Sequence, residues 1–320
     1  MIYTIVHANN SNTILNGAQI NKYSNGEHST IDLNSKTVLV FDNYVVTENK
    51  EILKIEGNSV KLISRAAKTP TKIVVDKDSM YIADRLGSVY RLDNLSSLSA
   101  NPAENIPVYL FGSISMITDM KIADTSIITI DKDNKIRITD KSHPYRIKKF
   151  VLVHSKPLVS VEMFKEYIVA GGYDWYISFY NTETGRTAIF DLVEKEIKEI
   201  GDTLPGVENP KSISNINLEA ECRVRKILSF ENTILIITNE APLLLSVDSI
   251  EDLSITCKEI ENLSDSFIVD GTATADGYEI IDKTGRLFKL APSSPKPVRK
   301  LIVPNYANEV DVSIANKYFD

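Results

Sequence analysis

His154 and Asp174 are residues whose types would suit acid–base chemistry, because an imidazole beside a carboxylate can accept and return a proton. The chain has four histidines, and none stands in a metal-ligand pair such as HExxH. It also lacks a GxSxG nucleophile elbow, a P-loop and a GxGxxG phosphate loop. We therefore interpret His154 and Asp174 as a buried structural pair whose members satisfy each other's hydrogen bonds. We expect no catalytic residue, cofactor or metal site in this chain.

A run of basic residues is a second candidate, because cations suit contacts with phosphates and carboxylates. Between positions 132 and 156 the sequence has eight Lys or Arg and two Asp, a local charge of +6 in a chain of net charge −7. The remainder therefore carries −13, which argues against a protein that coats nucleic acid over its whole surface. The basic residues are Lys132, Lys135, Arg137, Lys141, Arg146, Lys148, Lys149 and Lys156.

The elements that must position these residues are short β-strands. Segments such as TKIVVD, SIITID and EYIVAGG alternate polar with β-branched or aromatic residues, and turn residues interrupt them every 8–12 positions. No run approaches the ~18 apolar residues that span a bilayer, and the start lacks the pattern of a secretory signal, so we expect no membrane contact. Cys222 and Cys257 have no metal-type spacing, which favours reduced thiols in the cytosol or nucleus.

A hairpin pattern recurs along the chain. Asp84–Asp93, Asp131–Asp140 and Gly172–Asn181 align without gaps, and weaker copies begin at positions 15, 47, 239 and 282. A period near 40–45 residues is typical of four-stranded propeller blades, which bury their faces by stacking around an axis. We therefore predict an all-β protein, a seven-bladed WD40-type β-propeller that forms a single domain over residues 1–320.

The longest step between successive repeats points to an insertion at about 194–221. This segment is acidic and rich in Pro, Gly, Ser and Asn. We predict a loop excursion between blades, whose first residues, EKEIKEI, form one short helical turn.

The fourth and fifth repeats resemble WD repeats in detail. Val153-His154 stands where those repeats usually have Gly-His, and Asp174 lies in the tight turn before the strand YISFYN. The resemblance implies a hydrogen bond between His154 and Asp174 that pins the hairpin. The preceding repeat has Phe111-Gly112-Ser113 without a histidine, so we expect packing alone to hold that blade.

Ser115–Arg186 resembles the WD-repeat, non-catalytic subunit of the tRNA (guanine-N7)-methyltransferase over about 70 residues. The motif Ser-Met-Ile-Thr-Asp ends at Asp119, and the motif DKDNKIRI spans 131–138. Further matches are Pro144-Tyr145, Val153-His154, Val159-Ser160 and Gly171-Gly172-Tyr173-Asp174. The chain departs from the family where Phe111-Gly112-Ser113 replaces Leu-Gly-His and where Tyr173 interrupts a triple glycine.

The resemblance implies a heterodimer with a catalytic subunit that binds S-adenosylmethionine and methylates a guanine in the tRNA variable loop. The propeller would stabilise that subunit and help position the tRNA. The resemblance places the partner contact on Arg137, supported by Lys135. Residues at i and i+2 of a strand share a face, and an arginine suits a bidentate carboxylate contact. A solvated strand face is the alternative for this pair.

Lys141, Arg146, Lys148 and Lys149 form the loop toward the next blade, and we expect them to face tRNA or to be a solvated basic loop. Two other functions stay open at this point: a WD-repeat scaffold in another assembly, such as ribosome biogenesis or a ubiquitin ligase, and a propeller enzyme. We expect a nuclear location, with the cytoplasm as a second compartment.

Overall fold

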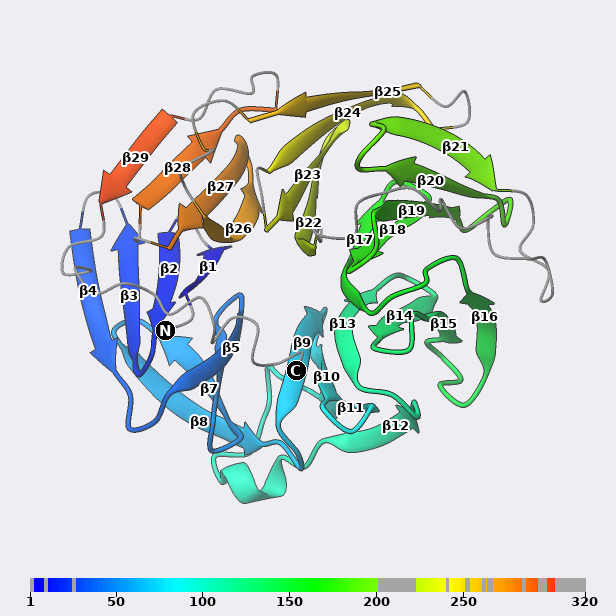
Figure 1. The fold of residues 1–320 in the computed structure, drawn as a ribbon. Coiled ribbons are helices and arrows are strands. Elements are labelled where there is room, and N and C mark those ends of the chain that lie inside the picture. Colours follow the sequence, from blue (N-terminus) through cyan, green and yellow to red (C-terminus); the bar gives the residue numbers. More distant parts are fainter. Residues whose placement is uncertain are drawn as a thin grey trace.

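The strands form a ring of antiparallel sheets around a central axis (Figure 1). The structure is a computed structural model, and it describes residues 3–8, 11–24, 27–200, 223–239, 242–250, 254–260, 263, 267–283, 286–292 and 298–302. Within these residues there are seven sheets, each built from strands that are consecutive in the sequence. We call the sheets blades one to seven in chain order.

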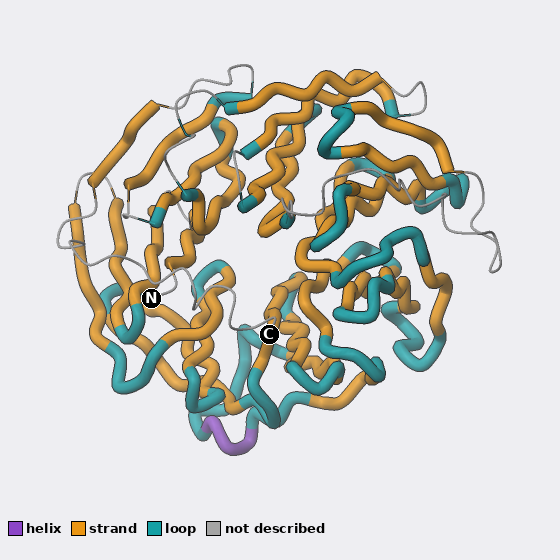
Figure 2. The backbone as a smooth tube through the Cα atoms, viewed as in Figure 1, coloured by secondary structure: helices purple, strands orange, loops and turns teal. Residues whose placement is uncertain are grey.

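Strands account for nearly all of the regular structure (Figure 2). Blades one to three contain β1 (Tyr3–Ala8), β2 (Ser11–Asn16), β3 (Gln19–Ser24), β4 (Glu27–Asp32), β5 (Thr37–Phe41), β6 (Tyr44–Thr47), β7 (Glu51–Glu56), β8 (Ser59–Arg65), β9 (Pro70–Asp76), β10 (Ser79–Asp84), β11 (Ser88–Asp93) and β12 (Val108–Gly112). A short 3₁₀ helix, η1 (Pro102–Glu104), lies between β11 and β12.

Blades four and five contain β13 (Ile117–Ile122), β14 (Ser126–Asp131), β15 (Ile136–Asp140), β16 (Ile147–Val151), β17 (Leu158–Phe164), β18 (Tyr167–Gly172), β19 (Tyr176–Asn181), β20 (Thr187–Asp191) and β21 (Glu196–Ile200). Blades six and seven contain β22 (Val224–Phe230), β23 (Thr233–Thr238), β24 (Leu243–Ser249), β25 (Ser254–Glu259), β26 (Ile268–Thr274), β27 (Gly277–Asp282), β28 (Arg286–Leu290) and β29 (Val298–Ile302).

The predicted architecture of seven blades with four strands each needs a correction. Six of the described sheets have four strands, whereas blade five has five, because β21 pairs with the outer edge of β20. The helical turn predicted for EKEIKEI is therefore wrong: Glu196–Ile200 is a strand, and Ile197 packs against the core of blade five. The remainder of the predicted insertion, 201–221, lies outside the described residues.

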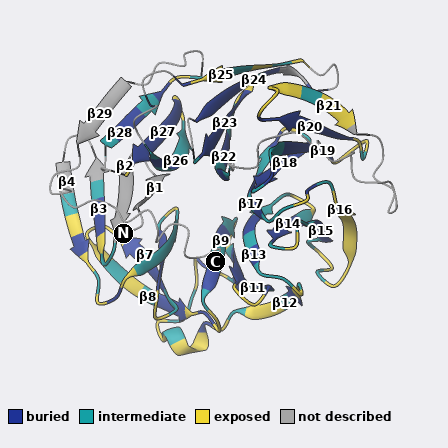
Figure 3. Cartoon of the chain, viewed as in Figure 1, coloured by how far each residue is buried: buried dark blue, intermediate teal, exposed yellow. Residues whose placement is uncertain are grey.

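Burial explains the sequence pattern of each blade. The second strand of a blade lies between neighbouring blades and is buried on both faces, so β18, β23 and β27 are buried at every residue. The outermost strands face solvent and carry charged residues, as β16 does with four exposed residues of five (Figure 3). The apolar runs in the sequence therefore mark the second strands.

The sequence repeats coincide with one structural feature. All seven repeat starts fall at the end of a second strand, where the chain turns into the third strand. The innermost strands lie side by side around the ring, and β1 packs next to β26. No described blade takes a strand from the other end of the chain, so no described ladder joins blade seven to blade one. No described helix is long and apolar enough to cross a membrane.

Candidate functional site

His154 and Asp174 are in contact, as the sequence predicts, and a third residue joins them. The Nδ1 atom of His154 lies 3.0 Å from both carboxylate oxygens of Asp174, and its Nε2 atom lies 2.8 Å from the Oγ atom of Ser178. Asp174 also accepts the backbone N–H of Ser155. A Ser-His-Asp arrangement can form a nucleophile, but Ser178 is 0% exposed, so its hydroxyl cannot reach a substrate.

Sequence reasoning missed Ser178. The only signal was a hydroxyl within the otherwise apolar and aromatic strand YISFYN. The three side chains connect the entry of blade five to its second hairpin, which fits the predicted structural role; that role stays a prediction.

Arg137 occupies in β15 the position that Ser178 occupies in β19. In the ungapped alignment of the two repeats, both residues follow the first isoleucine of the third strand. The Nε atom of Arg137 donates to Thr139 Oγ1 at 3.0 Å, and its Nη1 atom donates to the carbonyl oxygen of Gly112 at 2.8 Å. The guanidinium carbon lies 4.3 Å from the centroid of the Phe111 ring.

These contacts change the interpretation of Arg137. The residue is 8% exposed, and burial lowers the pKa of its guanidinium from the usual value. Its main contacts bind blade four to β12 of blade three, so Arg137 is not a freely solvated cation on a strand face. Among the described residues, no contact engages its Nη2 atom. Lys135 does not join it and instead pairs with Asp133 at 3.1 Å. The partner-binding role of both residues stays a prediction.

Two exposed aromatic side chains lie beside Arg137. Tyr109 on β12 lies near the guanidinium and acts on its pKa, and Phe150 on β16 is its cross-strand partner. We name the β12–β16 surface as the exposed residues Val108, Tyr109, Ile114, Phe150 and Leu152. Ile114 is 100% exposed. Neighbouring exposed apolar side chains of this size are typical of a protein-binding surface.

The four cations of the predicted tRNA-facing loop differ in the contacts that they make. Lys141 pairs with Asp76 of β9 at 2.6 Å and donates to the Ala123 carbonyl oxygen, so it joins blades three and four. Lys148 donates to the carbonyl oxygen of Thr125 and to the hydroxyl of Ser126. Arg146 and Lys149 are exposed, and no ion pair engages them among the described residues. These two therefore keep their charge available to a ligand.

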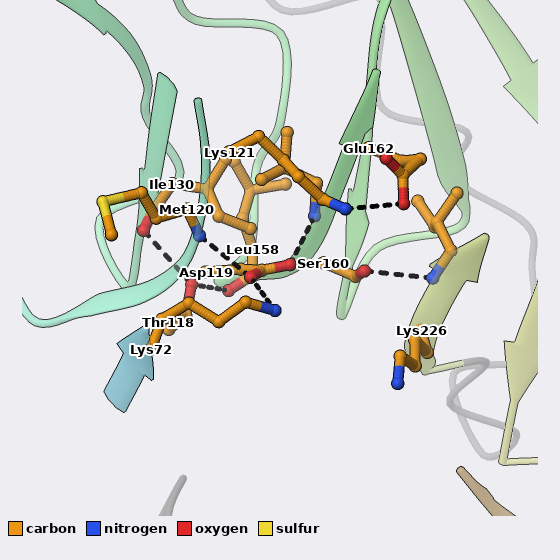
Figure 4. Close-up of polar contacts among 12 residues, drawn as sticks. Lys72, Thr118, Asp119, Met120, Lys121, Ile130, Leu158, Ser160, Glu162 and Lys226 are labelled. Carbon is orange, nitrogen blue, oxygen red and sulfur yellow. Dashed lines mark hydrogen bonds and ion pairs between the residues drawn. The ribbon is translucent and has the colours of Figure 1, made fainter. Parts of the chain in front are cut away.

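Asp119, the last residue of the Ser-Met-Ile-Thr-Asp motif, joins three blades (Figure 4). Its carboxylate lies 2.7 Å from Lys72 Nζ of blade three and accepts the backbone N–H of Val161 of blade five at 3.0 Å. Burial alone would raise the pKa of Asp119, but Lys72 and Lys121 hold it below the usual value. The neighbouring Thr118 donates to the Leu158 carbonyl oxygen of blade five at 2.7 Å.

The positions equivalent to Asp119 in blades five and six make similar contacts. Asp119, Ser160 and Lys226 each follow a β-bulge near the start of an innermost strand. The hydroxyl of Ser160 accepts the N–H of Ile227, and Lys226 pairs with Asp270 at 2.5 Å. A second ion pair, Lys121–Glu162 at 2.8 Å, joins blades four and five. Polar contacts between innermost strands therefore hold blade four, which carries Arg137, against both neighbours.

The described residues contain no group of three or more His, Cys, Asp or Glu that could hold a metal ion. The solved structures show the fold alone. A structure of U3-55K superposes with a TM-score of 0.63 at 13% identity and covers 96% of this chain and 93% of that chain. The WD40 repeats of RRP9 give 0.61 at 14% identity, covering 88% of this chain and 86% of that chain.

Sequence relatives are more informative. The chain is 31% identical over 115 residues to the tRNA (guanine-N(7)-)-methyltransferase non-catalytic subunit wdr4 of Danio rerio, covering 34% of this chain and 26% of that protein. It is 28% identical over 243 residues to the non-catalytic subunit TRM82 of Meyerozyma guilliermondii, covering 70% of this chain and 56% of that protein. The matches thus span about a quarter to just over half of these relatives.

A family model described as the tRNA methyltransferase TRM82 WD40 domain matches residues 99–276. This range includes the motifs that end at Asp119 and span Arg137, and the His154–Asp174 pair. The matched residues form more than half of the chain and extend from the end of blade three into blade seven. The chain therefore belongs to the family of tRNA methyltransferase TRM82 WD40 domains.

Proposed function

We propose that this chain is the non-catalytic WD-repeat subunit of a tRNA (guanine-N7)-methyltransferase. The family match over 99–276 carries the proposal, since the relatives are named as non-catalytic subunits of that enzyme. The only Ser-His-Asp arrangement described above is closed to solvent, which supports a role in assembly and not in chemistry. S-adenosylmethionine would bind to the catalytic subunit.

The β12–β16 surface is the proposed docking site for the catalytic subunit, in a heterodimer. Its exposed apolar residues would be covered by the partner, as in the centre of a protein interface. Arg137 would present its Nη2 edge to a carboxylate of the partner, while Gly112, Thr139 and Phe111 hold the guanidinium in place. A guanidinium held in one orientation loses little conformational entropy on binding.

Contact with tRNA is the second part of the proposal. Arg146 and Lys149 are exposed cations of the predicted loop that make no ion pair among the described residues, and they lie on the outer side of blade four, beside the docking surface. They would contact the phosphate backbone and help to position the variable loop at the catalytic subunit. The proposed location of the complex is the nucleus, with the cytoplasm as a second compartment.

Affinity purification of the chain from its native source tests the proposal. We expect mass spectrometry to identify a methyltransferase subunit and the bound RNA to be tRNA, and we expect the complex to form N7-methylguanosine. Purification with a ribosome-assembly complex or a ubiquitin ligase, without a methyltransferase, would support the scaffold alternative instead. Methyl transfer by the isolated chain would contradict the non-catalytic assignment.

A further inference from the structure

Tyr145 projects from the hairpin between β15 and β16 of blade four. Its side chain is 81% exposed, and among the described residues it is the one exposed aromatic side chain outside the β12–β16 surface. A single exposed apolar residue is ordinary on a protein surface, so its meaning depends on how the ring is held and on what lies beside it.

The backbone of this hairpin fixes the position of the ring. The carbonyl oxygen of His143 accepts the N–H of Arg146 at 2.8 Å, which closes a β-turn with Pro144 and Tyr145 at its centre. Proline fixes its own φ angle and favours the second position of such a turn. The Oδ1 atom of Asp140 also accepts the N–H of His143 at 3.1 Å. A ring presented by a fixed turn loses little conformational entropy on binding.

A second ring supports Tyr145. The ring centroids of His143 and Tyr145 lie 5.9 Å apart, at an interplanar angle of 76°. An edge-to-face contact of this kind orients the tyrosine ring without covering both of its faces. The imidazole is itself exposed, so neither ring is enclosed. The open face of the tyrosine can therefore stack on a flat ring of a ligand.

Two exposed cations accompany the ring. Arg146 follows Tyr145 directly, and Lys149 lies four positions after it in β16. Neither cation makes an ion pair among the residues that the structure describes. An aromatic ring that stacks on bases, beside cations that reach the phosphate backbone, is the arrangement with which proteins bind single-stranded nucleic acid.

The register of β16 separates this arrangement from the docking surface. Lys149 pairs with Ile138 across the ladder, and Phe150 pairs with Arg137. Adjacent residues of a strand point to opposite faces, so Lys149 points away from the face that carries Phe150 and Arg137. The hairpin that carries Tyr145 lies beyond the end of β15. The hairpin can therefore contact RNA while a catalytic subunit covers the docking surface.

We propose that Tyr145, oriented by His143, stacks on an unpaired base of RNA while Arg146 and Lys149 contact neighbouring phosphates. The choice of RNA rests on the proposed function, in which the complex contacts tRNA. A base contact goes beyond the phosphate contacts proposed for this loop, because it selects single-stranded segments, whose bases are free to leave the stack. It selects no particular sequence, since every base has a flat face.

Titration of the full chain with a uridine decamer that carries a central 2-aminopurine tests this contact, because stacking quenches the fluorescence of that base. We expect Tyr145→Leu to weaken binding about tenfold and to abolish the quenching, without changing the slope of log K against log salt. Tyr145→Phe keeps the ring and should behave as the wild type does. Arg146→Gln should instead keep the quenching and reduce the slope by about 0.7 units.

Ile106→Ala is the control for loss of an exposed apolar side chain, because Ile106 lies between η1 and β12 and outside the hairpin. It should change neither binding nor quenching, and thermal unfolding establishes that each variant is folded. A folded Tyr145→Leu protein that binds and quenches as the wild type does would overturn the base contact. A wild-type chain that leaves the fluorescence of the probe unchanged would overturn it as well.

A contact of Tyr145 with the catalytic subunit would give a different result. Tyr145→Leu would then lose the copurifying subunit while its binding of the RNA probe stayed unchanged, and this outcome would overturn the proposal. Copurification of a methyltransferase with the wild-type chain is a separate measurement, so failure of the proposed function is distinguishable from failure of the base contact.

Discussion

Blades three, four and five have different residues four positions before the first paired residue of the innermost strand. Blades four and five also differ at the residue after the first isoleucine of the third strand. In blade five, His154 stands four residues before Leu158, the first paired residue of its innermost strand, and contacts Asp174 and Ser178. In blade four the residue four positions before Ile117 is Ser113, whose hydroxyl lies 3.3 Å from Asp131. Packing alone therefore does not hold this blade, which corrects the expectation from its missing histidine.

Blade three has Ala66 four positions before Pro70, and Ala66 has no hydroxyl or imidazole to offer. The Oδ1 atom of Asp84 accepts two backbone N–H groups, but its Oδ2 atom is buried without a partner among the described residues. The residue four positions before the innermost strand therefore determines whether both oxygens of the hairpin aspartate accept a hydrogen bond. The comparison also explains Arg137. In blade five, Ser178 contacts His154, whereas blade four has no such histidine, and Arg137 at the equivalent position reaches the carbonyl oxygen of Gly112.

The largest effect is expected at Asp119, which joins blade four to blades three and five. Asp119→Ala should destabilise the propeller by about 3–5 kcal/mol, because it leaves Lys72 partly buried without its partner. Since the folded pKa of Asp119 is lowered, its contribution is present above the unfolded value near 4 and is lost as the pH falls through the folded pKa. Urea unfolding of wild type and variant at pH 7 and pH 3 measures both effects. Equal acid sensitivity of the two proteins would contradict the assignment.

Arg137→Ser gives blade four the side chain that blade five has at this position. We expect the affinity for the catalytic subunit to fall by about 2–5 kcal/mol if the partner carboxylate is buried, and by less at the rim. Serine fits a strand, so the propeller should stay folded, whereas Arg137→Glu would bury a carboxylate beside the Gly112 carbonyl oxygen. Calorimetric titration with the catalytic subunit is the measurement, and Arg146→Ser is the control for an exposed arginine. Undiminished affinity of the serine variant would remove Arg137 from the interface.

His154→Ala should lower the free energy of unfolding by about 1–3 kcal/mol, because Asp174 and Ser178 both lose their partner inside the blade. Chemical denaturation measures the loss. Ser178→Ala removes a single contact and should cost less than His154→Ala. A fully stable His154→Ala protein would contradict the structural role of the pair.

Ser113→Ala should have a smaller effect of about 0.5–1 kcal/mol, since its hydrogen bond to Asp131 is long and Ser113 is only half-buried. Burial raises the pKa of Asp131, although the N–H groups of Lys135 and Asp133 act in the opposite direction. Denaturation of this variant beside His154→Ala compares the two blades directly. A loss as large as that of His154→Ala would show that the blades do not differ in the way proposed.

Ala66→Ser should be stabilising by about 0.5 kcal/mol, because it offers Asp84 Oδ2 the hydroxyl that blade four already has. The gain should disappear when Asp84 is replaced by alanine in the same protein, which a double-mutant cycle measures. A gain that persists without Asp84 would have another cause.

Local patterns were predictable, and contacts between blades were not. The seven hairpins were located from alternation and turn residues because both signals lie within about ten positions. His154 and Asp174 were paired through the known chemistry of the repeat. The Lys141–Asp76 ion pair joins residues 65 positions apart, and nothing in the local pattern separates it from an exposed loop cation.

Arg137 shows the same limit at the candidate site. Its strand and position were predicted, but its burial depends on Phe111 and Gly112 of another blade. The segment EKEIKEI contains enough helix-forming residues to suggest a turn of helix, yet the open edge of β20 made a fifth strand more favourable. Tertiary pairing therefore overrode local propensity there.

The build-up of each blade from consecutive strands has a consequence for biosynthesis. Every described backbone ladder is complete once four or five neighbouring strands have left the ribosome, so a blade can form while the next is still being translated. Such local contacts favour rapid folding, whereas the packing of β26 against β1 must wait until both strands have been synthesised. No described ladder crosses that seam, so it should be the first place to open in hydrogen exchange.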